Sequence, residues 1–450
     1  MQLSKPSCRF TRRQLRNQSW VQTSCAKRGL GVFLLSLLVV RCEDFIAIGL
    51  EPNKFVSSRG LAYELLGETS SILKSGIAMT ESTTSSAKAG MEVPEALSAK
   101  NMRGDSELCL ATFTWNGTKL SFKDYLDISC NGYKELVDAM RLRMELYERF
   151  LEYCLKNDVY FRTRQFSFVL DFTDGTRNLG EFHQILRKPF LGFGKSAADH
   201  SVLLIPDPHF IAGIMSQIPD LVPFGLRAFG EAMLRDNYTP HPTCNGIDTP
   251  WNEKRDIAIY RGGCTPTIDV ETADFATRFF VRSDLCDRYA NATLLDVGVY
   301  LDGVCSGDNM YDFCKKCQPC NGKPRIEPAE TPCYKYQIQV DGHGPSYDAT
   351  IRKLLSKSVM FLVRHDSGVQ LELFFYPLLK PYKHYIPTDV KGLEASVQWC
   401  VAHDAACEEI AEQAYKLTTK MLNPDFLTDY TPAVLRKAYE QTVVFETDKL

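Results

Sequence analysis

The sequence predicts an α/β protein, and two kinds of pattern support this prediction. Short runs rich in β-branched and aromatic residues occur at 166–170, 202–205, 256–260 and 358–363. Apolar residues recur at helical spacing in 134–155 and in 396–422. Strands that end in Asp, Gly or Arg and are followed by helical patterns are typical of chains that alternate strand and helix.

Length and charge limit the broad class of the protein. The 450 residues are 44% hydrophobic and 11% aromatic, which is enough to bury one large core or two medium ones. Because 52 basic residues stand against 55 acidic ones, no positive excess is available to bind a nucleic-acid backbone. The first 28 residues hold seven Lys or Arg and no acidic residue, so the remainder is acidic, with 45 basic against 55 acidic residues.

An apolar run follows the basic tail at 1–28. Residues 29–40 read GLGVFLLSLLVV, a length that suits the hydrophobic region of a secretory signal, whereas a bilayer needs ~20 residues. Extended to residue 48, the same run would be an imperfect signal anchor with the basic tail in the cytoplasm. Both alternatives stay open for 29–48. The segment at 49–106 contains a stretch rich in Ser, Thr, Ala and Gly and predicts a flexible stem.

Cysteine usage favours the secretory pathway. Fourteen of the 16 cysteines follow the apolar run, and Asn-X-Ser/Thr sequons stand at Asn116, Asn237 and Asn291. The Cys-x-x-Cys-x-x-Cys segment at 314–320 could hold zinc as thiolates or could form disulfides. An oxidising lumen favours disulfides, so we assign no metal to this chain.

Three loops concentrate residues that suit ligand binding, at 171–175, 260–265 and 340–346. Each follows a predicted strand, and ligands of open α/β sheets bind beyond the carboxyl ends of strands. Backbone N–H groups and an Arg at such turns suit a diphosphate. None of the loops matches the Walker or dinucleotide fingerprints, so these residues predict only an anion-binding α/β enzyme.

The C-terminal third carries a more specific pattern. It contains DGHG at 341–344, LFFYPLLKPYKHYIP at 373–387 and WCVAHD at 399–404. Further back stand FGK at 193–195, IPD at 205–207 and WNEKRDIAIYRGGCT at 251–265. In this order, from about Tyr133 to Tyr430, these segments resemble glycosyltransferase family 90. The family includes Rumi-type protein O-glucosyltransferases and capsule-associated xylosyltransferases.

The resemblance implies a GT-B-like fold, in which two Rossmann-like domains face a cleft. The N-terminal, acceptor-side domain with the catalytic Asp would span 107–245, the UDP-sugar-binding domain 246–400, and C-terminal helices 401–450.

The implied activity is inverting, metal-independent transfer of glucose or xylose from UDP-glucose or UDP-xylose to a hydroxyl of a protein or glycan, without a cofactor. No two aspartates of the chain are separated by a single residue, so the Asp-x-Asp metal clamp of the other common glycosyltransferase fold is absent.

The resemblance also implies site residues. Asp174 matches the general base that takes the proton of the acceptor hydroxyl, and Asp171 is the alternative. The more ordinary role of an Asp after a strand is a turn or helix cap. Arg261 with Gly262 and Gly263 matches the family's Arg-Gly turn near the uridine diphosphate.

A second donor-side group lies further along the chain. Arg282 matches a second family arginine, with Arg278 as the alternative; a solvated helix face is the ordinary role of both. Gly342, Gly344 and Ser346 match the family's Asp-Gly-x-Gly-x-Ser turn, in which glycine lets the backbone approach phosphate closely.

The chain also departs from the family pattern. Family members place an Arg soon after that turn, where this chain has Ala349 and Thr350, and Arg352 is the nearest substitute. The departures leave a binding protein open: either an inactive lectin or scaffold of the same fold, or a secreted disulfide-rich interaction protein. The end of the chain, 447–450, only loosely resembles a retrieval signal, so endoplasmic reticulum and Golgi both stay open.

Overall fold

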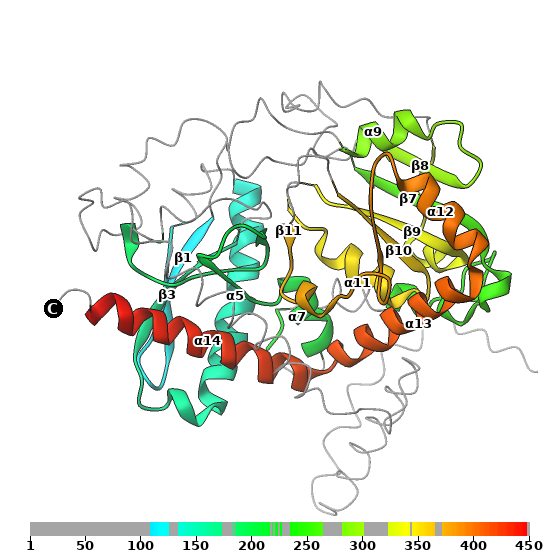
Figure 1. Cartoon of the computed structure of the whole chain (residues 1–450). Helices are drawn as coiled ribbons and strands as arrows, with labels where there is room; N and C mark the ends of the chain where they lie inside the picture. Colours follow the sequence, from blue (N-terminus) through cyan, green and yellow to red (C-terminus); the bar gives the residue numbers. More distant parts are fainter. Residues whose placement is uncertain are drawn as a thin grey trace, which may run out of the picture. The chain divides into compact units, whose positions relative to one another are not determined.

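The described part of the chain folds into two five-stranded sheets with covering helices (Figure 1). A computed structural model describes residues 109–125, 134–172, 185–216, 235–263, 281–300, 323–364 except 343, and 371–447, with isolated residues between 183 and 226. The predicted basic tail, signal or anchor segment and stem lie outside the described residues.

The first sheet has the strand order β2-β1-β3-β4-β6. Its strands are β1 (Leu110–Trp115), β2 (Leu120–Asp124), β3 (Phe166–Asp171), β4 (Phe190–Gly192) and β6 (Val202–Leu204). β1 pairs antiparallel with both β2 and β3, whereas β3, β4 and β6 run parallel. The carboxyl ends of these three parallel strands therefore meet at one edge of the sheet.

The second sheet is parallel throughout, with the order β12-β10-β9-β7-β8. Its strands are β7 (Arg255–Gly263), β8 (Leu295–Tyr300), β9 (Tyr334–Val340), β10 (Val359–Arg364) and β12 (Ile386–Asp389). All seven residues of β9 are buried, as expected for the central strand of a parallel sheet that is covered on both faces. These sheets confirm the predicted α/β class.

One predicted strand extends further than expected. The sequence placed a turn directly after Tyr260, but β7 continues through Gly263 because Arg261, Gly262 and Gly263 all pair with β8. The two glycines are therefore strand residues. The prediction of a turn at 260–263 was wrong because the strand partner that extends β7 lies more than 30 residues away, beyond the reach of local turn propensity.

Seven α-helices are described: α5 (Lys134–Asn157), α7 (Pro208–Met215), α9 (Val281–Arg288), α11 (Tyr347–Leu355), α12 (Leu393–Ala402), α13 (Asp404–Met421) and α14 (Pro424–Thr447). Short 3-10 helices are η5 (Val159–Phe161), η6 (Asp236–Tyr238), η7 (Gly246–Asp248), η8 (Trp251–Glu253), η10 (Pro328–Cys333) and η11 (Tyr376–Leu378). The predicted helical stretch at 396–422 is divided between α12 and α13, because the backbone of His403 leaves the helical region.

The last helix, α14, returns to the first sheet and runs beside β3 and α5 (Figure 1). The hydroxyl of Tyr430 donates to the carbonyl of Leu204 at 2.8 Å, and Arg187 donates to the carbonyl of Phe445 at 3.1 Å. The end of the chain therefore stabilises elements that precede it by more than 200 residues.

Three further contacts join the residues after β4 to later segments of the chain, and one of them forms a separate two-stranded sheet. β5 (Lys195–Ser196) pairs antiparallel with β11 (Leu371–Glu372). After β4, the ring of Phe193 lies 5.1 Å from that of Tyr347, and a Cβ on Gly194 would come within 2.9 Å of Pro345. Because Pro345 and Tyr347 follow β9, these contacts bring the residues after β4 against the residues after β9.

Disulfides confirm the predicted use of cysteine. Cys244 pairs with Cys333, and Cys400 pairs with Cys407 across the break between α12 and α13. Cys109 and Cys286 are also disulfide-bonded, whereas Cys154 is a buried free thiol whose pKa burial raises. The segment at 314–320 lies outside the described residues.

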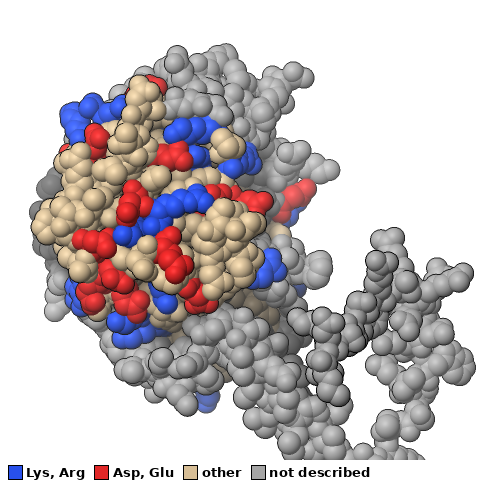
Figure 2. All heavy atoms as spheres, turned by 90° about the vertical axis from the view of Figure 1, so that its right-hand side faces the viewer, with Lys and Arg blue, Asp and Glu red and all other residues tan. Residues whose placement is uncertain are grey.

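On the face of the molecule that carries α12 and α13, basic and acidic side chains are interspersed (Figure 2). Among the described residues of this face, basic side chains form no broad surface of the kind that a nucleic-acid backbone requires. Among the helices in the described part of the chain, none is both long and apolar enough to cross a membrane.

Burial of His183 predicts sensitivity to acid. Its ring lies 5.0 Å from that of Phe445 and 6.4 Å from that of Phe190, and burial lowers its pKa to about 4 against the opposing charge of Asp199. The unfolded chain takes up this proton near pH 6.5, so the free energy of unfolding should fall as pH drops from 6.5 towards 4.

We expect His183→Phe, which keeps an aromatic ring at this position, to remove up to roughly 3 kcal/mol of that loss. Urea unfolding of both proteins at pH 7 and at pH 4.5 measures the difference. Equal acid sensitivity of the two proteins would contradict the assignment.

Candidate functional site

The strand order of the second sheet places a candidate site between β7 and β9. In chain order β8 lies on one side of β7, while β9, β10 and β12 follow on the other. Such a reversal opens a crevice at the carboxyl ends of the two neighbouring strands, where ligands of doubly wound sheets bind. Here those ends are Gly263 of β7 and Val340 of β9.

Arg282, from α9, bridges the two strand ends. Its Nη1 donates to the carbonyl of Gly263 at 2.8 Å, and its Nη2 donates to the carbonyl of Val340 at 3.3 Å. Its Nε is buried and makes no hydrogen bond within the described part of the chain. Both acceptors are neutral carbonyls, and the charge of Arg282 also acts on the nearby Asp341 carboxylate.

A tight turn connects β9 to α11 beside this guanidinium. Asp341 accepts hydrogen bonds from the backbone N–H of Ser346 at 3.1 Å and from the Gln339 amide at 3.3 Å. Gly342 N–H donates to the carbonyl of Gly344, and the Ser346 hydroxyl donates to that of Val340, both at 3.1 Å. Burial raises the pKa of Asp341, although the N–H of Ser346 opposes this shift.

Positive charge exceeds negative charge around this turn. Arg352 pairs with Asp348 at 2.7 Å one helical turn away on α11. Lys353 donates to the side-chain carbonyl of Gln339, and burial, with the charges of Arg282 and Arg352, lowers its pKa to about 7. Below pH 7, where Lys353 is mostly protonated, three cations share two carboxylates, and an added anion would relieve the repulsion among them.

The far end of α11 is held by buried side chains from residues before β7. Lys254, which is 4% exposed, donates to the carbonyls of Ser356 and Lys357, both at 2.8 Å. The Asn237 amide donates to the carbonyl of Arg352 at 2.8 Å. Burial lowers the pKa of Lys254 to about 7, and its protonated form suits the dipole at the carboxyl end of the helix. These contacts fix the helix that carries Arg352 and Lys353.

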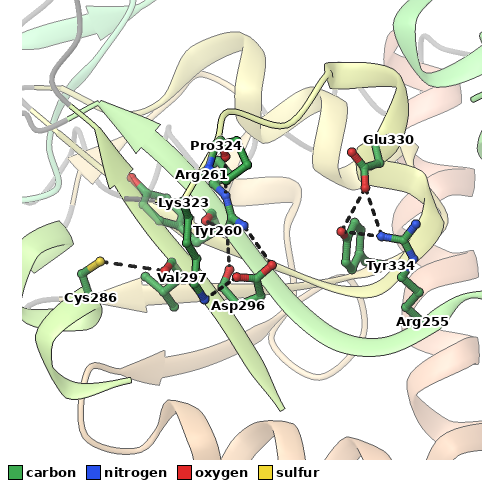
Figure 3. Close-up of polar contacts among 10 residues, drawn as sticks. All are labelled: Arg255, Tyr260, Arg261, Cys286, Asp296, Val297, Lys323, Pro324, Glu330 and Tyr334. Atoms are coloured by element: carbon green, nitrogen blue, oxygen red, sulfur yellow. Dashed lines mark hydrogen bonds and ion pairs between the residues drawn. The ribbon is translucent and has the colours of Figure 1, made fainter. Parts of the chain in front are cut away.

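Arg261 lies at the same end of β7 but is occupied by other groups (Figure 3). Its Nη2 contacts the carboxylate of Asp296 at 2.9 Å, and its Nη1 and Nε donate to the carbonyls of Tyr260, Asp296 and Pro324. Lys323 contacts the second carboxylate oxygen at 2.5 Å. Burial raises the pKa of Asp296, but the hydrogen bonds from Arg261 and Lys323 outweigh it and lower that pKa. In this arrangement Arg261 ties β7 to β8.

Of the predicted bases, only Asp171 is described. It is the last residue of β3 and is 6% exposed, whereas Asp174 lies three residues later, outside the described residues. The carboxyl end of β3 lies at the same sheet edge as that of β4, and residues after β4 contact Tyr347 and Pro345. β3, the strand that precedes Asp174 in the chain, therefore ends at the edge of the first sheet that lies against the turn after β9.

Residues 247–449 match the family described as Glycosyl transferase family 90. This part of the chain is similar to glycosyltransferase family 90. The predicted resemblance is confirmed there, and the matched range includes every strand of the second sheet together with α9, α11, α12, α13 and α14.

Curated relatives share only part of the chain. Uncharacterized protein 179R of Invertebrate iridescent virus 6 is 25% identical over 235 residues, which is 46% of this chain and 19% of that protein. Protein O-glucosyltransferase 1 of Bos taurus is 36% identical over 97 residues, 18% and 24% of the two chains. The O-glucosyltransferase rumi homolog of Aedes aegypti is 31% identical over 135 residues, 29% and 32%. The chain thus spans at most about a third of the length of these relatives.

Two cationic residues within 247–449, Arg364 and Lys353, were not singled out by the sequence analysis. Arg364 ends β10 at the same sheet edge, next to the strand that ends at Val340. A cation directly after an apolar run was the signal for it. Lys353 had no signal, because on α11 it looks like any polar residue of an amphipathic helix.

The contacts of Arg261 predict a structural role that can be measured in this family 90 segment. Arg261→Ala and Asp296→Ala should each destabilise the protein, and the double variant should lose less than the sum by roughly 1 kcal/mol or more. The control cycle uses Arg255 and Glu330, a 3.0 Å pair with the more exposed arginine (Figure 3). Its coupling should be smaller because solvent screens exposed pairs. If urea unfolding shows that the losses in free energy of unfolding of Arg261→Ala and Asp296→Ala simply add in the double variant, the predicted coupling between the two side chains is wrong.

Proposed function

We propose that the protein is an inverting, metal-independent glycosyltransferase that moves glucose or xylose from a UDP-sugar to a hydroxyl of a protein or glycan. The observation that supports this most strongly is the position of Arg282 between the ends of β7 and β9, within the family 90 segment. The similar bovine protein is a protein O-glucosyltransferase and the similar mosquito protein is an O-glucosyltransferase, which supports O-glucosyl transfer as the reaction class.

The donor diphosphate would bind at the turn between β9 and α11. As the bond between sugar and phosphate breaks, negative charge develops on the leaving UDP, and fixed cations that stabilise it often supply the largest share of catalysis. Arg282 would provide the stabilising positive charge, and the neighbouring Lys353 and Arg352 would add to it. Gly342 and Gly344 would let the backbone approach the phosphate, and the amino end of α11 would add its dipole. Arg261 would support this site by keeping β7 and β8 in register.

The acceptor hydroxyl would be activated by Asp174. A carboxylate that accepts the hydroxyl proton as the oxygen attacks the anomeric carbon completes an inverting displacement in one step. The proton moves to the carboxylate, the new glycosidic bond forms, and UDP leaves. Since β3 ends at the sheet edge that contacts the residues after β9, a GT-B-like arrangement would bring the base and the donor together.

The protein would act in the lumen of the secretory pathway, in the endoplasmic reticulum or the Golgi. The disulfides support this compartment, because such bonds are rare in the reducing cytosol.

A catalytically inactive UDP-binding scaffold is the alternative, and one observation favours it. The side chain of Arg261 is committed to Asp296 and backbone carbonyls, so one predicted diphosphate ligand is already occupied. Such a scaffold would bind UDP but would not release sugar from UDP-glucose or UDP-xylose.

Arg282→Ala should weaken UDP binding by about 2 kcal/mol, roughly 30-fold, because a charged hydrogen-bond partner is lost. Arg282→Lys should recover only part of this affinity, since Lys lacks the two-pronged guanidinium. Arg288→Ala, exposed at the end of the same helix, is the matched control and should leave affinity unchanged. Calorimetric titration with UDP in EDTA measures all four proteins. UDP binding that requires Mn²⁺, or that is unaffected by Arg282→Ala, would refute the site.

Asp174→Asn should slow sugar transfer ~10²- to 10⁴-fold while UDP affinity stays the same, because the base acts on the acceptor rather than on the diphosphate. Release of sugar from UDP-glucose and UDP-xylose, with water as acceptor, gives the rate, and titration gives the affinity. An unchanged rate in Asp174→Asn together with a loss in Asp171→Asn would move the base to Asp171.

A further inference from the structure

The three sequons differ in their structural environments. Attachment of an N-linked glycan requires that the Asn amide nitrogen be accessible and that a bulky, hydrated chain have room outside the fold. Asn116 and Asn291 are exposed, whereas Asn237 is 0% exposed. The three asparagines match the sequon pattern equally well, but they differ in exposure in the folded protein.

Asn116 stands at the tip of the hairpin between β1 and β2. Its side-chain oxygen accepts hydrogen bonds from the N–H and hydroxyl of Thr118, both at 3.0 Å, and from Lys119 N–H at 2.8 Å. Gly117 has a φ of +92°, which permits this tight turn. All three bonds go to the oxygen, so the nitrogen that would carry a glycan takes no part in holding the turn.

Asn291 lies in the loop between α9 and β8. Both Asn291 and the sequon residue Thr293 are exposed. The backbone N–H of Ala292 donates to the carbonyl of Tyr289 at 3.2 Å, so the main chain, rather than the Asn amide, shapes this loop. A glycan here would need no rearrangement of the fold.

Asn237 is the opposite case. Its amide nitrogen donates to the carbonyl of Arg352 at 2.8 Å and so helps to hold α11, which carries the cations of the candidate site. Its side-chain oxygen is buried as well. A glycan on this nitrogen would break the bond and would have to occupy packed interior, so a chain modified there cannot reach this structure.

The two exposed sequons also lie away from the sheet edges that carry the candidate site. β1 pairs antiparallel with β3, with Trp115 opposite Phe166, so Asn116 lies at the amino end of β3. Asn291 precedes β8, which runs parallel to β7, so it lies at the amino edge of the second sheet. The candidate site uses the carboxyl ends of β3, β7 and β9. Glycans at both positions would therefore leave that site open.

We propose that Asn116 and Asn291 are N-glycosylation sites of the folded protein and that Asn237 is an unmodified structural residue. The disulfides agree with passage through the oxidising compartment in which this modification is made. The proposal does not depend on glycosyltransferase activity.

The test expresses the full chain in a eukaryotic secretory host and maps peptides of the cell-associated and secreted protein after treatment with a peptide N-glycosidase, which converts glycan-bearing Asn to Asp. We expect conversion at Asn116 and Asn291 and none at Asn237. A glycan on Asn237 in folded protein, or bare Asn116 or Asn291, would overturn the proposal.

Asn→Gln variants of the three sequons distinguish glycan attachment from a structural role. Asn116→Gln and Asn291→Gln should each remove one glycan and leave UDP affinity unchanged. Asn237→Gln should leave the number of glycans unchanged but lower the melting temperature, because the bond to the Arg352 carbonyl is lost. A loss of one glycan in Asn237→Gln would contradict the assignment. These readouts stay informative if the protein transfers no sugar, since none of them measures catalysis.

Discussion

The bridge that Arg282 makes between the carbonyls of Gly263 and Val340 is the contact on which the candidate site depends. The chain leaves these neighbouring strands in opposite directions, which opens a crevice at their carboxyl ends. Arg282 gives the two carbonyls at this edge a shared donor, and the Ser346 hydroxyl also donates to Val340. A guanidinium can satisfy both and still present its charge to a ligand, since its donors fan out in a plane. One side chain therefore holds two strands and supplies a cation.

The turn after β9 and the helix that follows it are supported from two directions. At the amino end, Asp341 orders the turn through the Ser346 N–H. At the carboxyl end, Lys254 and Asn237, from residues before β7, hold the last carbonyls of α11. Because both ends are fixed, Lys353 is held where the charges of Arg282 and Arg352 reach it. The crowding of like charges, rather than any single residue, makes this region suited to an anion.

The roles of the two predicted donor arginines differ for a geometric reason. Arg261 points along β7 and β8, where the carboxylate of Asp296 and several carbonyls take up its donors. Arg282 comes from a helix at the crevice, where only two neutral carbonyls accept its hydrogen bonds in the described part of the chain. The same guanidinium group therefore connects two strands in Arg261 and is a candidate ligand-binding cation in Arg282.

Local patterns and ordered segments were enough to predict the α/β class, the strands at 166–170 and 256–260, the use of cysteine in disulfides and a resemblance to family 90 from about Tyr133 to Tyr430, which the family match covers over 247–449. The burial of Asn237, the end of β7 and the different contacts of Arg261 and Arg282 became visible only in the folded structure. Those outcomes depend on partners far away in the chain, such as Arg352 for Asn237 and Asp296 for Arg261. No local pattern encodes such partners, since the fold alone brings them into contact.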